Sequence, residues 1–380
     1  MLEAAEPRIG AVPAASGRVA IVGGGLAGFV SYLTLLHGKV EPDEITVFAT
    51  EADPAGPWRR RAAAIHQREM RSESDGHCLP RSFPGLAVRA TRTGGLVPLV
   101  LSICNRYHPS VDEFVDHVDE LRQRCGWDTR VVLQRVSRVR PVEGGFALNE
   151  HCVFRHVLLA TGHPGLALPP ELAGDPRVVH AYEPHEYAAN VAVIGAGMAA
   201  ATEWLNALAA GARVVSVRRH EPARQPLNVP RNLFSQRGLV RYHATGWQQR
   251  AELLDRLLGP SYPPGRTWDG PLEEATRAGR FSVAAEIDGV EQVICATGFL
   301  DPVGHDPVLT GLVRDYGLET CRRRIVLDDD CTVPALTSTE RTLAIAGRAA
   351  QWAHPAADTL VGMKYAARAF LRILRACPTR

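Results

Sequence analysis

The stretch RVAIVGGGLAGFVSYLTLL, residues 18–36, decides the fold. Residues 19–22 form a short apolar run of the kind that becomes a buried parallel strand, and an apolar pattern with helical period follows the glycines. Between the two, Gly23, Gly25 and Gly28 form the pattern G-x-G-x-x-G. In this context the first glycine permits a tight turn, the second lets the backbone approach a pyrophosphate, and the third lets the helix pack on the strand. The stretch therefore predicts a dinucleotide-binding fold, with the phosphates at the helix N-terminus.

The next strand is expected at residues 45–48, beside the first. An acid near the end of this strand often binds the ribose hydroxyls in such folds. Here Ala49 and Thr50 follow the strand, and the nearest acid is Glu51. Two interpretations stay open. Either Glu51 reaches the ribose from beyond the strand end, or water and backbone hold the hydroxyls and Glu51 is a solvated acid.

A second stretch repeats the pattern at residues 190–222, NVAVIGAGMAAATEWLNALAAGARVVSVRRHEP. A short apolar strand precedes Gly195, Gly197 and Ala200, which give G-x-G-x-x-A, and a helix and a further strand at residues 213–217 follow. The two motifs lie about 170 residues apart. Two such folds in one chain suggest a flavin that receives a hydride from a nicotinamide.

The strand at residues 213–217 ends in Arg218 and Arg219 rather than in an acid. A carboxylate would repel the 2′-phosphate of NADPH, whereas guanidinium groups can bind it with two hydrogen bonds. The pair therefore favours NADPH over NADH. The alternative is a solvated basic pair in an arginine-rich chain.

Two apolar strands end in the same tripeptide, Ala-Thr-Gly. They are HVLLATGHPG, residues 156–165, and QVICATGFLD, residues 292–301. Each is interpreted as a point where the chain crosses between two domains, with its glycine supplying the turn. A final strand is expected at residues 343–346, ending at Gly347, and a last helix from Pro355 to about residue 374.

Other segments show simpler patterns. Residues 107–127, YHPSVDEFVDHVDELRQRCGW, predict an amphipathic helix that begins with the capping box of Ser110 and Glu113. A strand is expected to follow at residues 130–139. The Pro/Gly-rich residues 260–271 predict a loop.

The composition excludes several classes of protein. Apolar residues make up 46% and charged residues 22% of the 380 residues, as in folded globular chains. The formal charge of +2 gives no support to a nucleic-acid-binding or membrane-surface protein. No apolar run reaches about 18 residues, and the N-terminus lacks a basic segment before an apolar core. We therefore expect no membrane span, no secretion signal and a cytoplasmic location.

Eight cysteines are scattered through the chain without a C-x-x-C pair and without the spacing of zinc ligands. Most are expected to be buried free thiols. The sequence thus predicts no metal site and no dithiol redox centre of the thioredoxin-reductase kind.

Together these motifs resemble those of the NADPH-dependent flavin monooxygenases, the group that contains the N-hydroxylating and flavin-containing monooxygenases. The resemblance rests on both glycine motifs, on Gly56 and Trp58 in PAGPW, on Arg71 and Ser72 in MRSES, and on YHPSVDEF, ATGHP and CATGF. It implies FAD at the first glycine motif and NADPH at the second. It also implies that the Val136 backbone contacts the adenine and that Trp58 lies near the isoalloxazine, with core packing as the alternative for Trp58. The turn residues that would line the cofactor clefts are Thr161, Gly162, Thr297, Gly298 and Gly347.

The expected fold class is α/β, with two Rossmann-like domains, the second inserted into the first. Residues 1–166 would form the first part of the FAD-binding domain. Residues 167–298 would form the NADPH-binding domain, and residues 299–380 the C-terminal part of the FAD-binding domain.

Three features depart from the family pattern. Residues 177–187, RVVHAYEPHEY, lack the F-x-G-x-x-x-H pattern of Baeyer–Villiger enzymes. Met198 and Ala199 stand where many N-hydroxylases carry Gln-Ser. Gly347 is followed by Arg348, where members similar to thioredoxin reductase carry Asp. This last change favours the monooxygenase branch.

The resemblance implies a monooxygenase that hydroxylates a small molecule, of unknown identity, through a peroxyflavin. Two alternatives stay open. One is an NAD(P)H-dependent flavin reductase or dehydrogenase without oxygen transfer, and the other is a non-catalytic nucleotide-binding protein.

Candidate residues beyond the cofactor motifs are few, because the cofactor itself performs the difficult step. His354 is a weak catalytic candidate, and an interior histidine is the alternative. Arg59, Arg60 and Arg61 could attract an anionic substrate or a cofactor phosphate, or form a solvated run of charge. Residues 96–103 and the C-terminal helix are candidates for shielding the flavin from water.

Overall fold

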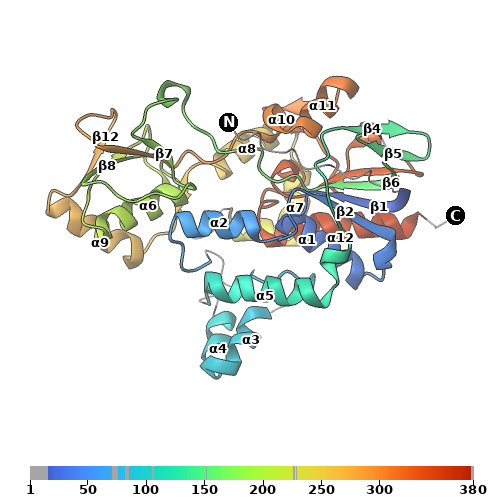
Figure 1. The fold of residues 1–380 in the computed structure, drawn as a ribbon, viewed down its shortest axis with the longest axis horizontal. Coiled ribbons are helices and arrows are strands. Elements are labelled where there is room, and N and C mark those ends of the chain that lie inside the picture. The colour runs from blue at the N-terminus through green and yellow to red at the C-terminus, as the bar shows by residue number, and fades with distance from the viewer. Residues whose placement is uncertain are drawn as a thin grey trace, which may run out of the picture.

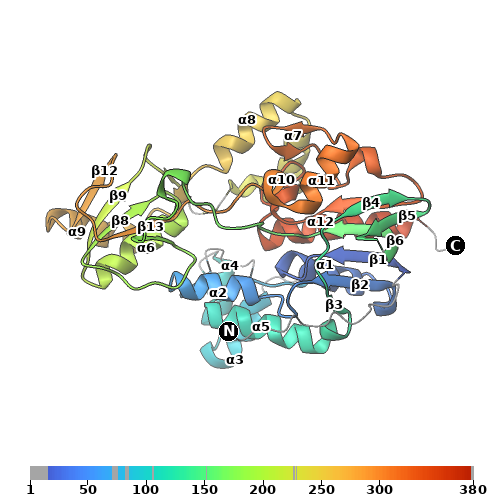
Figure 2. The same ribbon diagram turned by 45° about the horizontal axis from the view of Figure 1, so that its top comes forward.

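The computed structural model describes residues 16–70, 76–81, 85–104, 107–150, 152–225, 227 and 229–377. Arg71 and Ser72, which contributed to the resemblance, lie outside the described residues. Figures 1 and 2 show two sheets toward opposite ends of the long axis of the molecule, with helix α2 (Gly56–Ala64) between them. The two sheets are built from separate parts of the chain.

The first sheet has seven strands and a parallel centre. Strand β1 (Ser16–Val22) lies between β2 (Ile45–Ala49) and β6 (Cys152–Leu159), and β3 (Val131–Leu133) pairs with β2. The last strand of the chain, β16 (Thr342–Ile345), pairs in parallel with the second half of β6. The first half of β6 pairs instead with an antiparallel hairpin, β5 (Gly145–Leu148) and β4 (Val139–Val142).

The second sheet has five strands, all parallel, in the order β12-β9-β8-β13-β7. The strands are β7 (Val178–His180), β8 (Asn190–Ile194), β9 (Arg213–Val217), β12 (Phe281–Ala284) and β13 (Gln292–Cys295). Since β16 returns to the first sheet afterwards, the second unit is inserted into the first. The predicted fold class is confirmed.

Helices connect and cover the strands. In each unit the helix after the glycine turn follows the first strand of its motif: α1 (Leu26–His37) follows β1 and α6 (Met198–Ala209) follows β8. The C-terminal helix α12 (Leu360–Ala376) packs against α1. The other helices are α3 (Gly85–Gly94), α4 (Val97–Ile103), α5 (Val111–Arg124), α7 (Gln236–His243), α8 (Trp247–Leu257), α9 (Arg266–Arg277), α10 (Pro302–His305) and α11 (Pro307–Tyr316).

The remaining elements are short. They are the 3-10 turns η1 (Pro42–Glu44), η2 (Trp127–Thr129), η3 (Pro170–Leu172), η4 (Arg231–Phe234), η5 (Pro334–Leu336) and η6 (Arg348–Ala350), and the strands β10 (Ala223–Arg224), β11 (Ser261–Tyr262), β14 (Thr320–Cys321) and β15 (Arg324–Ile325). Among the described helices, none has the length and apolar character needed to cross a membrane.

One stretch of the expected inserted domain packs elsewhere. Residues 229–257 include η4, α7 and α8, and six of their buried residues belong to the core of the first unit: Val229, Leu233, Tyr242, Ala251, Leu254 and Leu257. The Tyr242 hydroxyl also donates a hydrogen bond to the Trp352 carbonyl, 2.9 Å away. Apolar side chains join whichever core they contact, so position in the chain does not decide domain membership here. The bounds 167–298 stay a prediction.

Three predicted elements begin or end elsewhere. The last helix starts at Leu360, not at Pro355, because Thr359 is its N-cap and accepts a hydrogen bond from the Gly362 N–H. The strand expected at residues 130–139 stops at Leu133, and the chain resumes as a strand at Val139. The loop expected at residues 260–271 contains β11 and the first turns of α9, with Pro271 inside that helix.

The predicted capping box is confirmed. Helix α5 begins after Ser110, whose hydroxyl accepts a hydrogen bond from the Glu113 N–H at 3.1 Å, while a Glu113 carboxylate oxygen accepts from the Ser110 N–H at 2.9 Å. The Tyr107 hydroxyl donates to the other oxygen of Glu113. This arrangement fixes the start of the helix that carries Phe114 into the core.

The Ser110→Ala variant is expected to lose about 1 kcal/mol of unfolding free energy, because a helix N–H loses its partner. Urea unfolding measures the loss. Thr276→Ala is the control, since its exposed hydroxyl caps no helix and bonds only the Leu272 carbonyl. Equal stability of Ser110→Ala and the unchanged protein would contradict the role of the cap.

Candidate dinucleotide-binding sites

A cavity of about 610 Å³ lies in the first unit, at the carboxyl ends of β1, β2 and β6. This edge of a parallel sheet is where ligands bind in such folds. Helix α12 and residues 305–307 close another side of the cavity. Eight of the residues singled out in the sequence line it together: Gly23, Gly25, Glu51, Trp58, Val136, Thr161, Gly162 and Gly347.

The first glycine turn has the geometry that its sequence predicts. Gly23 has φ 116°, and a Cβ there would collide with the Ala160 carbonyl oxygen. A Cβ on Gly28 would collide with the Gly23 carbonyl oxygen, so the third glycine brings the helix onto the turn. Gly25 differs, since no heavy atom lies within 4 Å of its Cβ position. The turn is thus closed on the protein side and open in front of the N-terminus of α1.

Glu51 lies on the cavity wall with its carboxylate held by a neighbour. Its two oxygens accept hydrogen bonds from Arg60, at 2.8 and 2.9 Å. Ala49 stands at the strand end, where an acid often binds the ribose. It lies against the glycine turn, because a Cβ on Gly24 would meet the Ala49 methyl. Glu51 is the acid nearest to the strand end that lines the cavity, and its contact with a ribose stays a prediction.

Trp58 packs against a core residue and also lines the cavity, and its place near the isoalloxazine stays a prediction. Its indole packs edge-on against Phe114, with ring centroids 4.9 Å apart, and it also lines the cavity. Val136 is buried beside Gln134 and Arg135 at the far side of the same cavity. Gly162 has φ 75°, a conformation that glycine adopts without strain.

The second glycine turn is built in the same way. Gly195 has φ 131°, and its Cβ would lie 2.5 Å from the Ala296 carbonyl oxygen. No heavy atom lies within 4 Å of the Cβ position of Gly197, the N-cap residue of α6. Ala200 is fully buried, as expected for the position that packs helix on strand.

The two Ala-Thr-Gly segments lie side by side. Leu166 forms an antiparallel bridge with Phe299, and the Ala167 N–H donates to the Gly298 carbonyl at 3.0 Å. The Thr297 hydroxyl donates to the Ala167 carbonyl. The crossings between the two units are therefore tied to each other.

The two arginines at the end of β9 differ in exposure and in their bonded partners. The Arg218 side chain is 10% exposed and forms an ion pair with Glu221 at 2.7 Å. Its guanidinium carbon lies over the Trp204 ring, 5.6 Å from the ring centroid. Arg219 is exposed, and no hydrogen bond or ion pair to it occurs among the described residues. Of the pair, Arg219 is the one available to a phosphate.

The three arginines after Trp58 also differ in their contacts. Arg59 bonds Asp119 at 3.2 Å, and Arg60 bonds Glu51. Arg61 alone of the three lines the cavity, with its guanidinium 4.6 Å from the centre of the Phe299 ring. Burial lowers the pKa of Arg61.

His354 is placed outside the cavity lining. It is 1% exposed, its Nδ1 accepts a hydrogen bond from the Ala356 N–H at 3.1 Å, and its ring lies 4.8 Å from that of Tyr365. Burial lowers its pKa to about 4. This placement fits an interior histidine, and a catalytic role stays a prediction without a contact to the cavity.

The expected flavin shield is only partly at the cavity. Leu360 and Met363 of the C-terminal helix line it. Residues 96–103 do not, and Leu96 and Ile103 are 72% and 67% exposed. His163 and Arg348 are among the cavity residues to which the sequence analysis gave no role, although each directly follows a predicted turn glycine.

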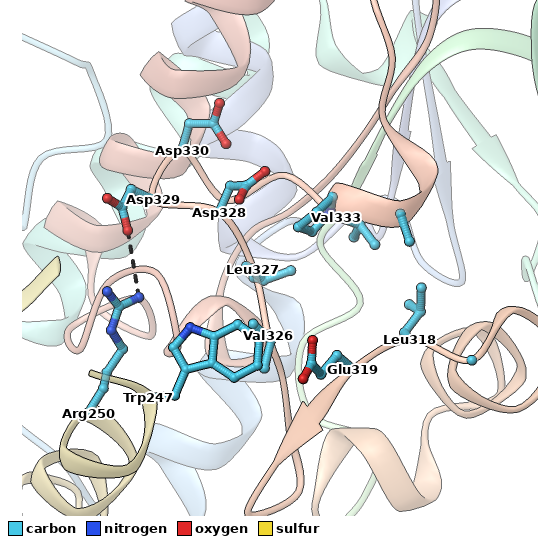
Figure 3. A pocket seen from close by; sticks show the side chains of 13 residues that line it. Trp247, Arg250, Leu318, Glu319, Val326, Leu327, Asp328, Asp329, Asp330 and Val333 are labelled. Carbon is cyan, nitrogen blue, oxygen red and sulfur yellow. Dashed lines mark ion pairs between the residues drawn. The ribbon is translucent and has the colours of Figure 1, made fainter. Parts of the chain in front are cut away.

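A second cavity, of about 780 Å³, lies elsewhere in the first unit and shares no lining residue with the first. Figure 3 shows Trp247 and Arg250 on one side and the three aspartates Asp328, Asp329 and Asp330 on the other. An Arg250 nitrogen lies 3.6 Å from an Asp329 oxygen. None of the predicted cofactor residues lines this cavity. Within the described part of the chain, no cluster of three or more metal-binding side chains occurs.

No protein-family model matches the sequence, and no curated protein sequence matches it. Solved structures match the fold over nearly the whole chain. The ornithine N-hydroxylase KtzI of Kutzneria sp. 744, in complex with reduced FAD, NADP+ and L-ornithine, has a TM-score of 0.72 at 16% identity, covering 95% of this chain and 99% of its own. A flavin monooxygenase from Stenotrophomonas maltophilia has a TM-score of 0.61 at 19% identity, covering 96% and 100%. The bacillithiol disulfide reductase Bdr of Bacillus cereus has a TM-score of 0.61 at 15% identity, covering 95% and 99%. The chain shares the two-unit fold of these proteins.

Proposed function

We propose that the chain is a FAD-dependent oxidoreductase that uses NADPH and hydroxylates a small molecule. One observation carries the proposal. In each of the two sheets, a parallel strand ends in a glycine turn that is closed toward the protein and open at its second glycine, Gly25 or Gly197. An open position at a helix N-terminus is where a pyrophosphate binds, and two such positions in one chain fit two different dinucleotides.

The first cavity fits FAD. Its lining includes the glycine turn, Trp58 and Val136, the residues expected at the pyrophosphate, the ring system and the adenine. The α1 N-terminus would hold the pyrophosphate, and Glu51 would meet the ribose. Trp58, fixed by its contact with Phe114, would pack beside the ring system.

The second turn fits NADPH. The α6 N-terminus would hold the pyrophosphate, and Arg219 at the end of β9 would bind the 2′-phosphate. Thr297 and Gly298 follow β13, the strand beside β8, so they stand near this turn. The β-bridge between the two crossing segments ties the two units to each other.

When bound, FAD would accept a hydride from NADPH and, once reduced, would react with oxygen. The protein positions the two dinucleotides and excludes water. Leu360 and Met363 add apolar surface to the cavity wall, and water exclusion limits wasteful release of hydrogen peroxide.

Thiol chemistry has less support, although the chain also matches a disulfide reductase in fold. No cysteine is among the residues lining the cavity. Cys78 and Cys331 are fully buried, and burial raises the pKa of the Cys78 thiol to about 12. A thiol of this kind is a poor nucleophile. The oxygen-dependent reaction is therefore favoured over reduction through a protein dithiol.

The cytoplasm is the location proposed for the protein. All eight cysteines are free, including Cys104, which is exposed. Free thiols without disulfides are typical of a reducing compartment. The substrate is proposed to be a small molecule, as L-ornithine is for the Kutzneria N-hydroxylase of similar fold.

The proposed oxidoreductase activity is tested by anaerobic titration of the purified protein. The protein should carry FAD, and NADPH should bleach the flavin absorbance stoichiometrically. A colourless protein that takes up no added FAD would overturn the proposal in favour of a non-catalytic nucleotide-binding protein.

A further inference from the structure

Two guanidinium groups in the first cavity have no partner of their own. Arg61 from α2 and Arg348 from η6 both line the cavity, and neither has a hydrogen bond or ion pair among the described residues. The pKa of His163 is lowered to about 3, mainly because the ring is buried, and the positive charges of Arg348 and Arg61 add to this shift. The two arginines therefore raise the positive potential around one imidazole.

None of the acids lining the cavity forms an ion pair with Arg61 or Arg348 among the described residues. Glu51 is bonded to Arg60, and Asp53 to Arg59 and to the Ala55 N–H. Asp306 caps helix α11, accepting from the Leu309 N–H at 2.9 Å. The fourth acid, Asp358, has a partner of its own. Among the described lining residues, three arginines have no ion pair, namely Arg61, Arg348 and the exposed Arg135. Each of the four acids has a partner, although Asp358 Oδ1 accepts no hydrogen bond from the described residues.

The side chains around these arginines are held in place. The His163 ring stacks on Phe299, with centroids 3.8 Å apart and planes 20° apart, and Arg61 lies over the same phenylalanine. Tyr182 stacks on Phe299 as well, 5.2 Å away. His163 keeps a buried Nδ1 without a hydrogen-bond partner. Partly buried cations and a buried polar atom without partners are costly, and a bound anion removes that cost.

We propose that Arg61 and Arg348 together bind one anionic oxygen group, a carboxylate or a phosphate, beside His163. Guanidinium groups suit both, because their donors match two oxygens at once. The proposed function assigns both pyrophosphates elsewhere, that of FAD to the open turn at Gly25 and that of NADPH to the open turn at Gly197. The remaining source is a carboxylate of the substrate, and this choice rests on the proposed function.

The test uses the FAD-loaded protein and the variants Arg61→Met and Arg348→Met, which keep a long side chain and remove the charge. Arg59→Met is the control, from the same helix but outside the cavity and paired with Asp119. Calorimetric titrations measure the Kd of NADP+, NAD+ and glutarate. NAD+ is included because it lacks the 2′-phosphate that Arg219 would bind. Arg61→Lys and Arg348→Lys, which keep the charge, should restore part of any lost affinity.

Both Met variants should weaken the same ligand class about tenfold or more. Weaker glutarate binding with unchanged NADP+ and NAD+ binding supports the proposal. Weaker NADP+ and NAD+ binding would show instead that the two arginines contact the nicotinamide dinucleotide. Unchanged Kd values in both variants, or a loss in only one of them, would overturn the proposal. So would a loss of FAD from Arg348→Met, because that arginine would then serve the flavin. A wild-type protein without FAD would instead overturn the proposed function, which the flavin spectrum reveals before any titration.

Discussion

Replacing Gly25 by valine is expected to abolish FAD binding. The Cβ position of Gly25 faces open space at the N-terminus of α1, on the cavity side of the turn. The glycine backbone there is extended, with φ −75° and ψ −171°, so valine is tolerated by the fold itself. Its side chain would occupy the space that a pyrophosphate needs, and the N–H groups of the helix could no longer be approached.

Gly246→Val is the matched control for this experiment. Gly246 is also an N-cap glycine with extended backbone, φ −63° and ψ 156°, and it also has no heavy atom within 4 Å of its Cβ position. It belongs to α8 and does not line the cavity. Both variants should unfold cooperatively, and only Gly25→Val should purify without the flavin absorbance. A yellow Gly25→Val protein with full FAD content would show that FAD does not bind at this turn.

The Arg219→Ala variant is expected to bind NADPH about 10- to 150-fold more weakly while its affinity for NADH stays unchanged. The range corresponds to the roughly 1.5–3 kcal/mol of one charge-assisted interaction. Arg219 is exposed and without a partner at the end of β9, so its removal costs the fold little.

Arg218 provides the contrast within this prediction. Its guanidinium is already bonded to Glu221 and packed over Trp204, so Arg218→Ala should lower thermal stability more than Arg219→Ala does. The rate of flavin reduction, measured against the concentration of each coenzyme, gives both affinities. Equal KM values for NADPH and NADH in the wild-type protein would contradict the assignment of a 2′-phosphate site.

Local rules made much of the fold predictable from the sequence. Gly28 must be small because the Gly23 carbonyl oxygen lies where its Cβ would be, and that requirement depends only on the turn and the helix after it. Ser110 and Glu113 bond each other across three residues. Such features depend on spacing along the chain, and they appear in the structure as expected.

Features that depend on distant partners could not be predicted in this way. Arg59, Arg60 and Arg61 are consecutive in the sequence, yet two of them have acids within reach and the third faces Phe299, which is more than two hundred residues away. The packing of residues 229–257 against the first core depends on contacts with a segment near Trp352. Periodicity along the chain contains no information about either contact.

The reaction of the reduced protein with oxygen tests the central claim most directly. The protein is reduced with NADPH under anaerobic conditions, mixed with oxygen in a stopped-flow instrument while NADP+ is bound, and followed across the flavin absorbance bands. We expect a transient species that absorbs between the reduced and oxidised bands, and a faster decay of that species when a suitable amine or carbonyl substrate is present. Direct return to the oxidised spectrum without a transient, with and without such substrates, would contradict a monooxygenase and identify the chain as a flavin reductase.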